Sequence, residues 1–188
     1  MIIETERLHL REMTEEDFPA LYAVLSDSDI MRHYPYTFDE SRVRGWIEKN
    51  IERYRVFGFG LWAVVLKQTG EVIGDCGITM QNINGMIRPE IGYHTAKAHQ
   101  RRGYAKEAAA ACRDWAFGNT PFNVLYSYMK TANAASAATA EANGMTLVDT
   151  FTDSEGEKTS VYAITKDEWE KMSKSLFSEF LARNVEKI

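Results

Sequence analysis

The chain of 188 residues has only two cysteines and four prolines, and it has no long hydrophobic run. Cys76 and Cys112 have no neighbouring cysteine or histidine pair at metal-ligand spacing, so the sequence predicts two buried free thiols and no metal site. No stretch approaches the roughly 18 consecutive apolar residues of a membrane-spanning helix, and the first residues do not resemble a secretory signal. We therefore expect a cytoplasmic protein that does not enter a membrane.

The sequence also lacks an excess of positive charge. Lysines and arginines number 22 against 27 aspartates and glutamates, which gives a net charge of −5. This balance argues against a nucleic-acid-binding protein that relies on overall basic charge. Hydrophobic residues make up 45% and charged residues 26% of the chain, which is typical of one globular domain able to bury its own core.

The hydrophobic pattern switches repeatedly between the periods of strands and helices. Strands are predicted at residues 8–11, 61–66, 71–80, 90–95, 124–128, 146–151 and 159–164, and helices at residues 14–25, 40–55, 103–117, 134–143 and 166–183. A polar loop is expected between the third and fourth strands, with Pro89 at the entry of the fourth. The mixture indicates an α/β or α+β fold with one domain over residues 1–165 and a C-terminal amphipathic helix over residues 166–188. The apolar side of that helix would carry Trp169, Met172, Leu176 and Phe180.

The segment with the clearest chemical meaning lies between a predicted strand and the most regular predicted helix. It reads Gln100, Arg101, Arg102, Gly103, Tyr104, Ala105 and Lys106. A glycine at such a turn lets the backbone approach a ligand, and the first N–H groups of the following helix are unpaired donors at the positive end of its dipole. The cations here suit a phosphate group; an ordinary turn glycine before a solvated helix start is the alternative.

This segment resembles the acetyl-coenzyme A (acetyl-CoA) binding motif of the GNAT superfamily of N-acetyltransferases. Gln100, Gly103 and Ala105 meet its Q/R-x-x-G-x-G/A pattern. Further matches follow in the family's order, at Thr5-Glu6-Arg7-Leu8, Gly70-Glu71-Val72-Ile73-Gly74, Glu90-Ile91-Gly92-Tyr93 and residues 133–144. Over most of the chain except the C-terminal helix, the sequence is similar to the ribosomal-protein-alanine acetyltransferase branch.

The resemblance implies a mixed, strongly twisted sheet of about six to seven strands, flanked by helices. Two adjacent parallel strands, residues 90–95 and 124–128, would separate and admit the pantetheine arm of acetyl-CoA, which would pair with the free strand edge. The implied donor site comprises the backbone of Tyr93, His94 and Thr95 along the pantetheine, residues Gln100, Arg101, Arg102, Gly103, Tyr104, Ala105 and Lys106 around the pyrophosphate, and Asn133 on the pantetheine or as a helix cap.

In this superfamily an amine attacks the thioester directly, so the enzyme accepts a proton from the amine and protonates the departing thiolate. Many relatives place a tyrosine seven residues after the asparagine for the second task, but here that residue is Ala140. The ribosomal-protein branch often has a serine three residues after it, so Ser136 is predicted to donate to the sulfur; the alternative is that it only caps its helix.

Two residues compete for the role of general base. Glu90 begins the central strand where relatives often carry an acid, although it could merely anchor that strand. His94 shares its strand face and could serve instead, whereas Asp75 and Tyr162 are weaker candidates. Aromatic residues within reach of the acceptor pocket are Tyr34, Tyr36, Trp46, Trp62 and Tyr162, and none is assigned a role.

We predict an acetyl-CoA-dependent N-acetyltransferase whose partner is an amine acceptor, either a protein N-terminus or a small amine. The negative net charge favours a cationic acceptor. Because Ala140 replaces the usual tyrosine, a non-catalytic acyl-CoA sensor is the alternative, and a scaffold that docks a partner through its C-terminal helix is another. The sequence does not decide between a monomer and a homodimer.

Overall fold

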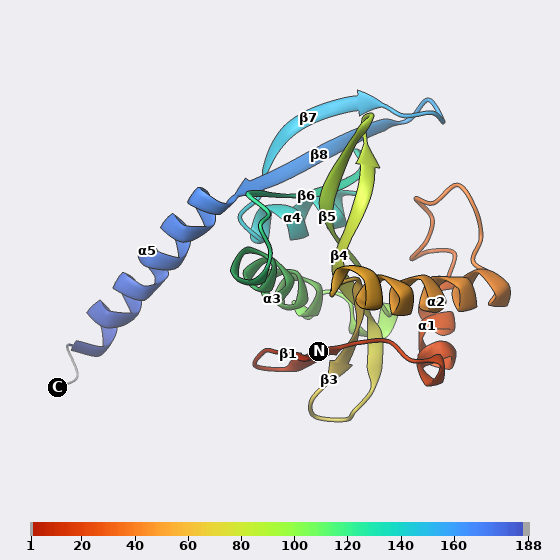
Figure 1. Cartoon of the computed structure of the whole chain (residues 1–188), viewed down its shortest axis with the longest axis horizontal. Helices are drawn as coiled ribbons and strands as arrows, with labels where there is room; N and C mark the ends of the chain where they lie inside the picture. Colours follow the sequence, from red (N-terminus) through yellow and green to blue (C-terminus); the bar gives the residue numbers. More distant parts are fainter. Residues whose placement is uncertain (1, 186–188) are drawn as a thin grey trace.

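The computed structural model describes residues 2–185, with side chains over residues 3–175. Within this range the chain forms one mixed sheet of eight strands in the order β1-β2-β3-β4-β5-β6-β8-β7, with helices on both faces (Figure 1). The predicted fold class is therefore confirmed. The strands are β1 (Ile2–Glu4), β2 (Leu8–Arg11), β3 (Leu61–Leu66), β4 (Val72–Ile83), β5 (Met86–Thr95), β6 (Val124–Lys130), β7 (Thr146–Thr152) and β8 (Lys158–Thr165). The helices are α1 (Phe18–Leu25), α2 (Glu40–Phe57), α3 (Tyr104–Asn119), α4 (Ala134–Ala142) and α5 (Lys166–Val185), with short 3-10 turns η1 (Glu15–Asp17) and η2 (Lys97–His99).

The polar segment between β4 and β5 is a tight turn, so the prediction of a loop there was wrong. Asn84 and Gly85 have φ angles of 51° and 79°, as a two-residue hairpin turn requires. The two strands consequently pair all the way from Gly74↔Thr95 to Ile83↔Met86. Pro89 therefore lies inside β5, opposite Met80, and not at its entry. At the other end of the sheet, β1 is a separate strand that pairs with β2, which brings the number of strands to eight.

The predicted separation of two parallel strands is present between β5 and β6. Their ladder contains one registered pair, Glu90↔Tyr126, whereas β6 pairs with β8 from Val124↔Thr165 to Lys130↔Thr159. Beyond that single pair, the Ser127 hydroxyl donates a hydrogen bond to the Ile91 carbonyl oxygen at 2.8 Å. The centre of the sheet is thus open along the later part of β5.

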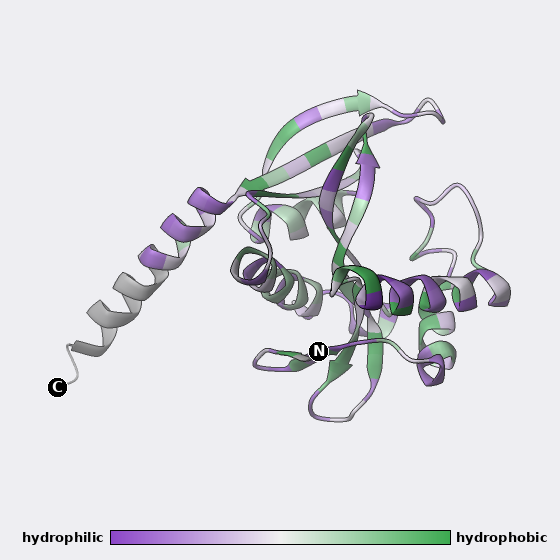
Figure 2. Cartoon of the chain, viewed as in Figure 1, coloured by the Kyte–Doolittle hydropathy of each residue, from purple (hydrophilic) through white to green (hydrophobic). Residues whose placement is uncertain are grey.

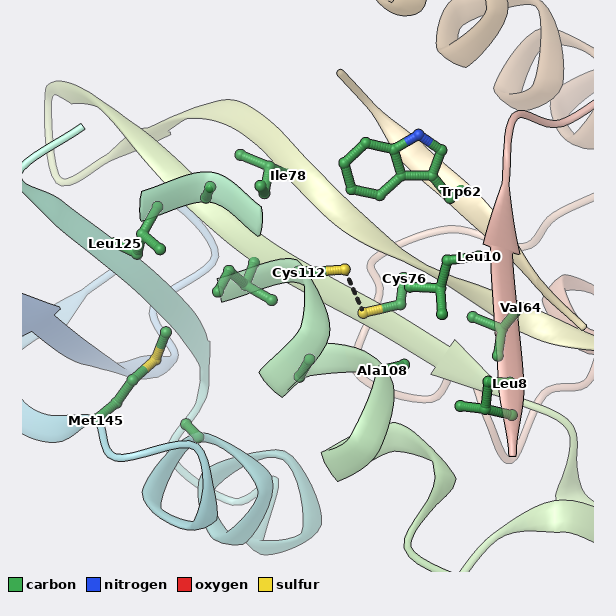
Figure 3. Packing of buried hydrophobic residues seen from close by; sticks show 14 of the residues in the cluster. Leu8, Leu10, Trp62, Val64, Cys76, Ile78, Ala108, Cys112, Leu125 and Met145 are labelled. Carbon is green, nitrogen blue, oxygen red and sulfur yellow. Dashed lines mark hydrogen bonds between the residues drawn. The ribbon is translucent and has the colours of Figure 1, made fainter. Parts of the chain in front are cut away.

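Two hydrophobic clusters cover the two faces of the sheet. One lies under α3 and contains the two cysteines, both buried, with their sulfur atoms 3.5 Å apart (Figure 3). The prediction of buried free thiols is confirmed. The other cluster lies under α1 and α2 and includes Leu21 and Ile47. Hydrophilic and hydrophobic residues alternate along α2 (Figure 2), whereas every residue of β3 is buried.

The last helix, α5, extends away from the sheet (Figure 1). Its first turns contact the domain: Trp169 Nε1 donates to Asp114 Oδ1 at 2.7 Å, and its ring centroid lies 5.4 Å from that of Phe117. The side chains of Leu176 and Phe180, expected on the same apolar side, lie outside the described residues. In the part of the chain that the structure describes, no helix has the length and apolar character needed to cross a membrane.

At Gly77, the backbone of β4 lies too close to the chain at the start of β3 to leave room for a side chain. A Cβ atom there would overlap the carbonyl oxygen of Gly60 and lie 2.7 Å from Leu61 Cα. Because both neighbours are backbone, Gly77→Ala should lower the free energy of unfolding by about 1–3 kcal/mol in chemical denaturation. Gly45→Ala is the control: nothing lies within 4 Å of its Cβ position in α2, so stability should rise by about 0.5–1 kcal/mol. Equal stability of the two variants would contradict this packing.

Candidate active site

A cleft of about 1160 Å³ follows the opening between β5 and β6. Its walls come from the segment after α1, α2, β4, β5, the start of α3, β6 and α4. The residues predicted from sequence that line it are Glu90, Tyr93, His94, Thr95, Gln100, Arg101, Gly103, Tyr104, Ala105, Lys106, Asn133 and Ser136. Arg102 is the exception, because it is absent from the lining and its carbonyl oxygen accepts a hydrogen bond from Arg7 Nη1 at 3.0 Å.

Along β5, backbone groups alternate between β4 and the cleft. Just past the strand, Ala96 N donates to Ile73 O on the β4 side at 2.8 Å. Since successive residues of a strand turn their N–H and C=O groups to opposite edges, His94 also faces β4, while Tyr93 and Thr95 face the opening. The Gln100 side chain, which donates to Thr95 O at 3.1 Å, approaches from that open side. Of the three residues expected to offer backbone groups to a ligand, Tyr93 and Thr95 are therefore suitably oriented and His94 is not.

The start of α3 is an uncapped helix N-terminus on the cleft. Its N-cap residue is Gly103, with a φ of 81° and no side chain to satisfy the first N–H groups. By contrast, α2 is capped by Asp39 and α4 by Asn133. Arg101 is held at a φ of 59°, a left-handed conformation that a non-glycine residue adopts at an energetic cost. Free N–H groups at the positive end of a helix dipole suit an anion such as phosphate.

The N-terminal hairpin holds this loop in place. Glu107, in the first turn of α3, accepts hydrogen bonds from the Thr5 hydroxyl at 2.6 Å and the Arg7 backbone N–H at 2.8 Å. The Arg7 guanidinium pairs with the same carboxylate at 2.6 Å and stacks 4.5 Å from the centre of the Tyr104 ring. Two segments that resemble the family in sequence, residues 5–8 and 100–106, thus meet in space.

On the α4 side of the cleft, Ser136 and Tyr93 bring two hydroxyl groups together. The hydroxyl oxygens are 3.1 Å apart, and Tyr93 also donates to the Ser136 carbonyl oxygen at 2.8 Å. The helix cap is Asn133, whose Oδ1 accepts from Ser136 N at 3.2 Å, so the Ser136 hydroxyl is not needed for capping. Burial raises the pKa of Tyr93, which keeps its hydroxyl protonated. Ala140 is buried in the core.

A chain of hydrogen bonds lies on the opposite face, under α2. Trp46 Nε1 donates to Asp75 Oδ2 at 2.8 Å, and His94 Nδ1 donates to Asp75 Oδ1 at 2.7 Å. His94 Nε2 lies 2.9 Å from the Tyr34 hydroxyl. Burial opposes protonation of His94, but the Asp75 carboxylate outweighs it and raises the pKa of the imidazole. Both ring nitrogens of His94 therefore have partners, and its orientation is well determined.

Glu90 lies on this same face, at the point where β5 and β6 part. Thr79, its partner across the β4–β5 ladder, donates a hydrogen bond to Oε2 at 3.1 Å. Burial raises the pKa of Glu90 to about 7, although the Thr79 hydrogen bond and the charges of His94 and Arg53 act to lower it. No described side chain occupies Oε1. A carboxyl group with this pKa and a free oxygen can accept a proton near neutral pH.

The sequence predicted some of these cleft residues but not the hydrogen bonds that join them. Tyr34, Tyr36 and Trp46 line the cleft, whereas Trp62 is buried in the core and Tyr162 lies outside the lining. Thr79 and Arg53 were missed altogether. The pairing of Thr79 with Glu90 depends on the β4–β5 register, for which the Asn84-Gly85 turn was the available signal.

Comparisons with known proteins agree on one family. Residues 7–146 match the family model of the acetyltransferase (GNAT) domain. The chain is 37% identical over 142 residues to an uncharacterized Bacillus subtilis protein, YkkB, covering 75% of this chain and 83% of that protein. It is 32% identical over 136 residues to an uncharacterized N-acetyltransferase of Bacillus licheniformis, p20, with 70% and 75% covered.

Solved structures extend the match. An acetyltransferase from Agrobacterium tumefaciens superposes with a TM-score of 0.76 at 33% identity, covering 87% of this chain and 94% of that one. RimL, a ribosomal-protein α-N-acetyltransferase in complex with coenzyme A, has the same fold, with a TM-score of 0.74 at 21% identity and coverage of 88% and 98%. With an uncapped helix N-terminus, an open central sheet and a matching family model over most of its length, the chain belongs to the GNAT family and is an N-acetyltransferase.

Proposed function

We propose that this enzyme transfers the acetyl group of acetyl-CoA directly to a primary amine, with Glu90 as the general base. The observation that carries the proposal is the position of Glu90 at the one registered pair of β5 and β6. Its carboxylate therefore lies at the inner end of the opening, where a ligand inserted between the strands would meet a ligand approaching from the α2 side.

The cleft residues fit acetyl-CoA. When bound, this molecule supplies an acetyl group activated as a thioester. The uncapped N–H groups at the start of α3 would hold its pyrophosphate, and Arg101 and Lys106 line the same end of the cleft and would screen the charge. Tyr93 and Thr95 would hydrogen-bond the pantetheine amides as an added strand does.

Glu90 is a better base than His94 because it has a free oxygen atom. Both nitrogens of His94 are engaged, by Asp75 and Tyr34. Glu90 has a bond to Thr79 on one oxygen only. Glu90 would accept the proton of the amine. His94, held by Asp75, would support the side of the cleft where the acceptor binds.

Ser136 would donate a hydrogen bond or a proton to the departing sulfur. Its hydroxyl lines the cleft, is not used for capping and is 3.1 Å from the Tyr93 hydroxyl. The acceptor in this proposal is a protein N-terminal amine or a small-molecule amine.

The role of Glu90 predicts a characteristic pH dependence. A base works when deprotonated, so kcat should rise with pH and level off above the pKa of Glu90, which burial raises to about 7. Glu90→Gln should remove this inflection and lower kcat by about 10²–10⁴-fold. The measurement is release of coenzyme A thiol with the best acceptor from a panel of short peptides, amino acids, amino-acid amides and polyamines.

His94→Gln is the matched comparison, because it alters a neighbour on the same strand face and leaves Glu90 in place. Its kcat should fall less, and the inflection should persist. An unchanged profile in Glu90→Gln together with a lost inflection in His94→Gln would make His94 the base.

A non-catalytic acyl-CoA sensor is the second candidate function, favoured by one observation. Ala140 is buried in the core, so no side chain from that position of α4 can reach a sulfur atom in the cleft. Ser136→Ala separates the two functions. An enzyme should lose turnover by about tenfold or more as a proton donor is removed, while its dissociation constant for acetyl-CoA, measured by calorimetry, stays nearly the same. A wild-type protein that binds acetyl-CoA but turns over no amine of the panel would be a sensor.

A further inference from the structure

Arg53 is a cation in the cleft to which the proposed acetyl transfer assigns no contact with either substrate. It comes from α2 and lines the cleft together with Thr79, Gln81 and Glu90. Thr79 and Gln81 pair with Glu90 and Arg88 in β5, well before the end of that strand, which leads to the start of α3 and the expected phosphate site. The guanidinium is close enough to Glu90 to lower its pKa, and among the described residues no salt bridge joins the two groups. Arg53 therefore faces the acceptor side of the site.

The guanidinium is held by a buried asparagine. Arg53 Nη1 donates to Asn50 Oδ1 at 3.1 Å, and the same oxygen accepts from Leu61 N at 2.9 Å. Asn50 itself is fully buried, and its Nδ2 donates to Trp46 O at 2.9 Å. Arg53 is thus linked through Asn50 to the first residue of β3.

The remaining N–H groups of Arg53 are available to a ligand. Among the described residues, Arg53 forms no salt bridge, and Asn50 is its one hydrogen-bond partner. The described side chains with a buried nitrogen that lacks a partner are Trp62, Arg88 and His99. Arg53 is not among them and lines the cleft, so its unbonded N–H groups are accessible. Partial burial lowers the pKa of Arg53. Because the pKa of a guanidinium is so high, the group nevertheless stays charged.

Glu90 is the carboxylate that acts on the charge of Arg53, and the other carboxylates around the cleft are bonded to other groups. Asp75 is engaged by His94 and Trp46. Asp153 and Glu155, farther along the cleft, both pair with Lys130. A guanidinium that is fixed, half-buried and unpaired beside a proton acceptor is suited to bind the planar carboxylate of a ligand.

We propose that Arg53 binds the carboxylate of the acceptor, so that the acceptor is a free α-amino acid or another small molecule with an amine beside a carboxylate. The inference rests on the proposed function, since it places the amine at Glu90. The positive charge of Arg53 favours an acceptor with a carboxylate, whereas the negative net charge of the chain favoured a cationic acceptor such as a polyamine.

The aromatic side chains that line the cleft together with Arg53 indicate which side chains such an acceptor carries. Tyr34 contacts Tyr36 and Phe38, with ring centroids 6.0 and 5.5 Å away, and Trp46 stands 5.8 Å from His94. Three of these rings, Tyr34, Tyr36 and Trp46, line the cleft. An apolar or aromatic amino-acid side chain would pack against this wall.

The reaction balances without a further reactant. The acceptor nitrogen forms a C–N bond to the acetyl carbon while the C–S bond of the thioester breaks, and the sulfur keeps the bonding electron pair. The ammonium group loses two protons in all. One passes through Glu90 to solvent, and the other is balanced by the proton that converts the coenzyme A thiolate to the thiol.

The test compares matched acceptors and matched variants. L-phenylalanine and L-leucine are each paired with their amides, which keep the amine and side chain but lack the carboxylate. The values are compared on the high-pH plateau, where Glu90 is deprotonated in both proteins, because loss of Arg53 also raises the pKa of Glu90. There, in Arg53→Gln, kcat/KM should fall about ten- to hundredfold for each amino acid, because charge-assisted hydrogen bonds are lost, and should change little for each amide. Arg53→Lys should recover part of the loss. Arg55→Gln, on the outer side of α2 where Arg55 pairs with Glu52, should leave all four values unchanged.

Three results would overturn the proposal. An equal fall for the amino acids and their amides would mean that Arg53 only tunes Glu90 or supports the fold. Turnover of peptides or amides but of neither amino acid would exclude carboxylate recognition and leave the proposed acetyl transfer intact. Failure of every amine in the panel, with acetyl-CoA still bound, would remove both proposals together.

Discussion

The arrangement of the site depends on how little β5 and β6 pair with each other. Two parallel strands at the centre of a sheet ordinarily share a continuous ladder, because unpaired backbone groups in a protein interior are unfavourable. Here the ladder has one registered pair, Glu90↔Tyr126, and then opens. Extended pairing of β4 with β5 and of β6 with β8 holds each strand from its other side. The open edge therefore persists without collapse of the sheet and forms the cleft.

Side chains of β5 point alternately to the two faces of the sheet, and this alternation places the residues proposed for the acceptor and for the donor on opposite sides. Side chains of Glu90 and His94 point to the α2 face, where an acceptor would bind, whereas Tyr93 points to α4 and Ser136. The backbone groups of Tyr93 and Thr95 face the opening. One strand thus fixes the proposed base, the proposed contacts to the acetyl donor and the hydroxyl pair relative to one another, as direct transfer between two bound substrates would require.

Local sequence signals account for most of the fold but for less of the site. The helix with Gly103 at its start and the alternating strands are visible because their periods and turn residues agree with their final structure. Asn84-Gly85 was available as a turn signal, yet the polar residues around it favoured a loop. Glu90 and Ser136 followed from the motif order. The contacts of Asp75 with Trp46 and His94, and of Arg53 with Asn50, join segments far apart in the chain, so only the strand register and the packing of α2 reveal them.

The most direct test of this account is amide hydrogen exchange along β5, measured residue by residue by NMR with and without coenzyme A. In the free protein the N–H groups of Gly92 and His94 face β4, whereas those of Tyr93 and Thr95 face the opening. Coenzyme A should slow exchange at Tyr93 and Thr95 and leave Gly92 and His94 nearly unchanged. Saturating binding of coenzyme A without protection at Tyr93 and Thr95 would contradict insertion of the pantetheine between β5 and β6.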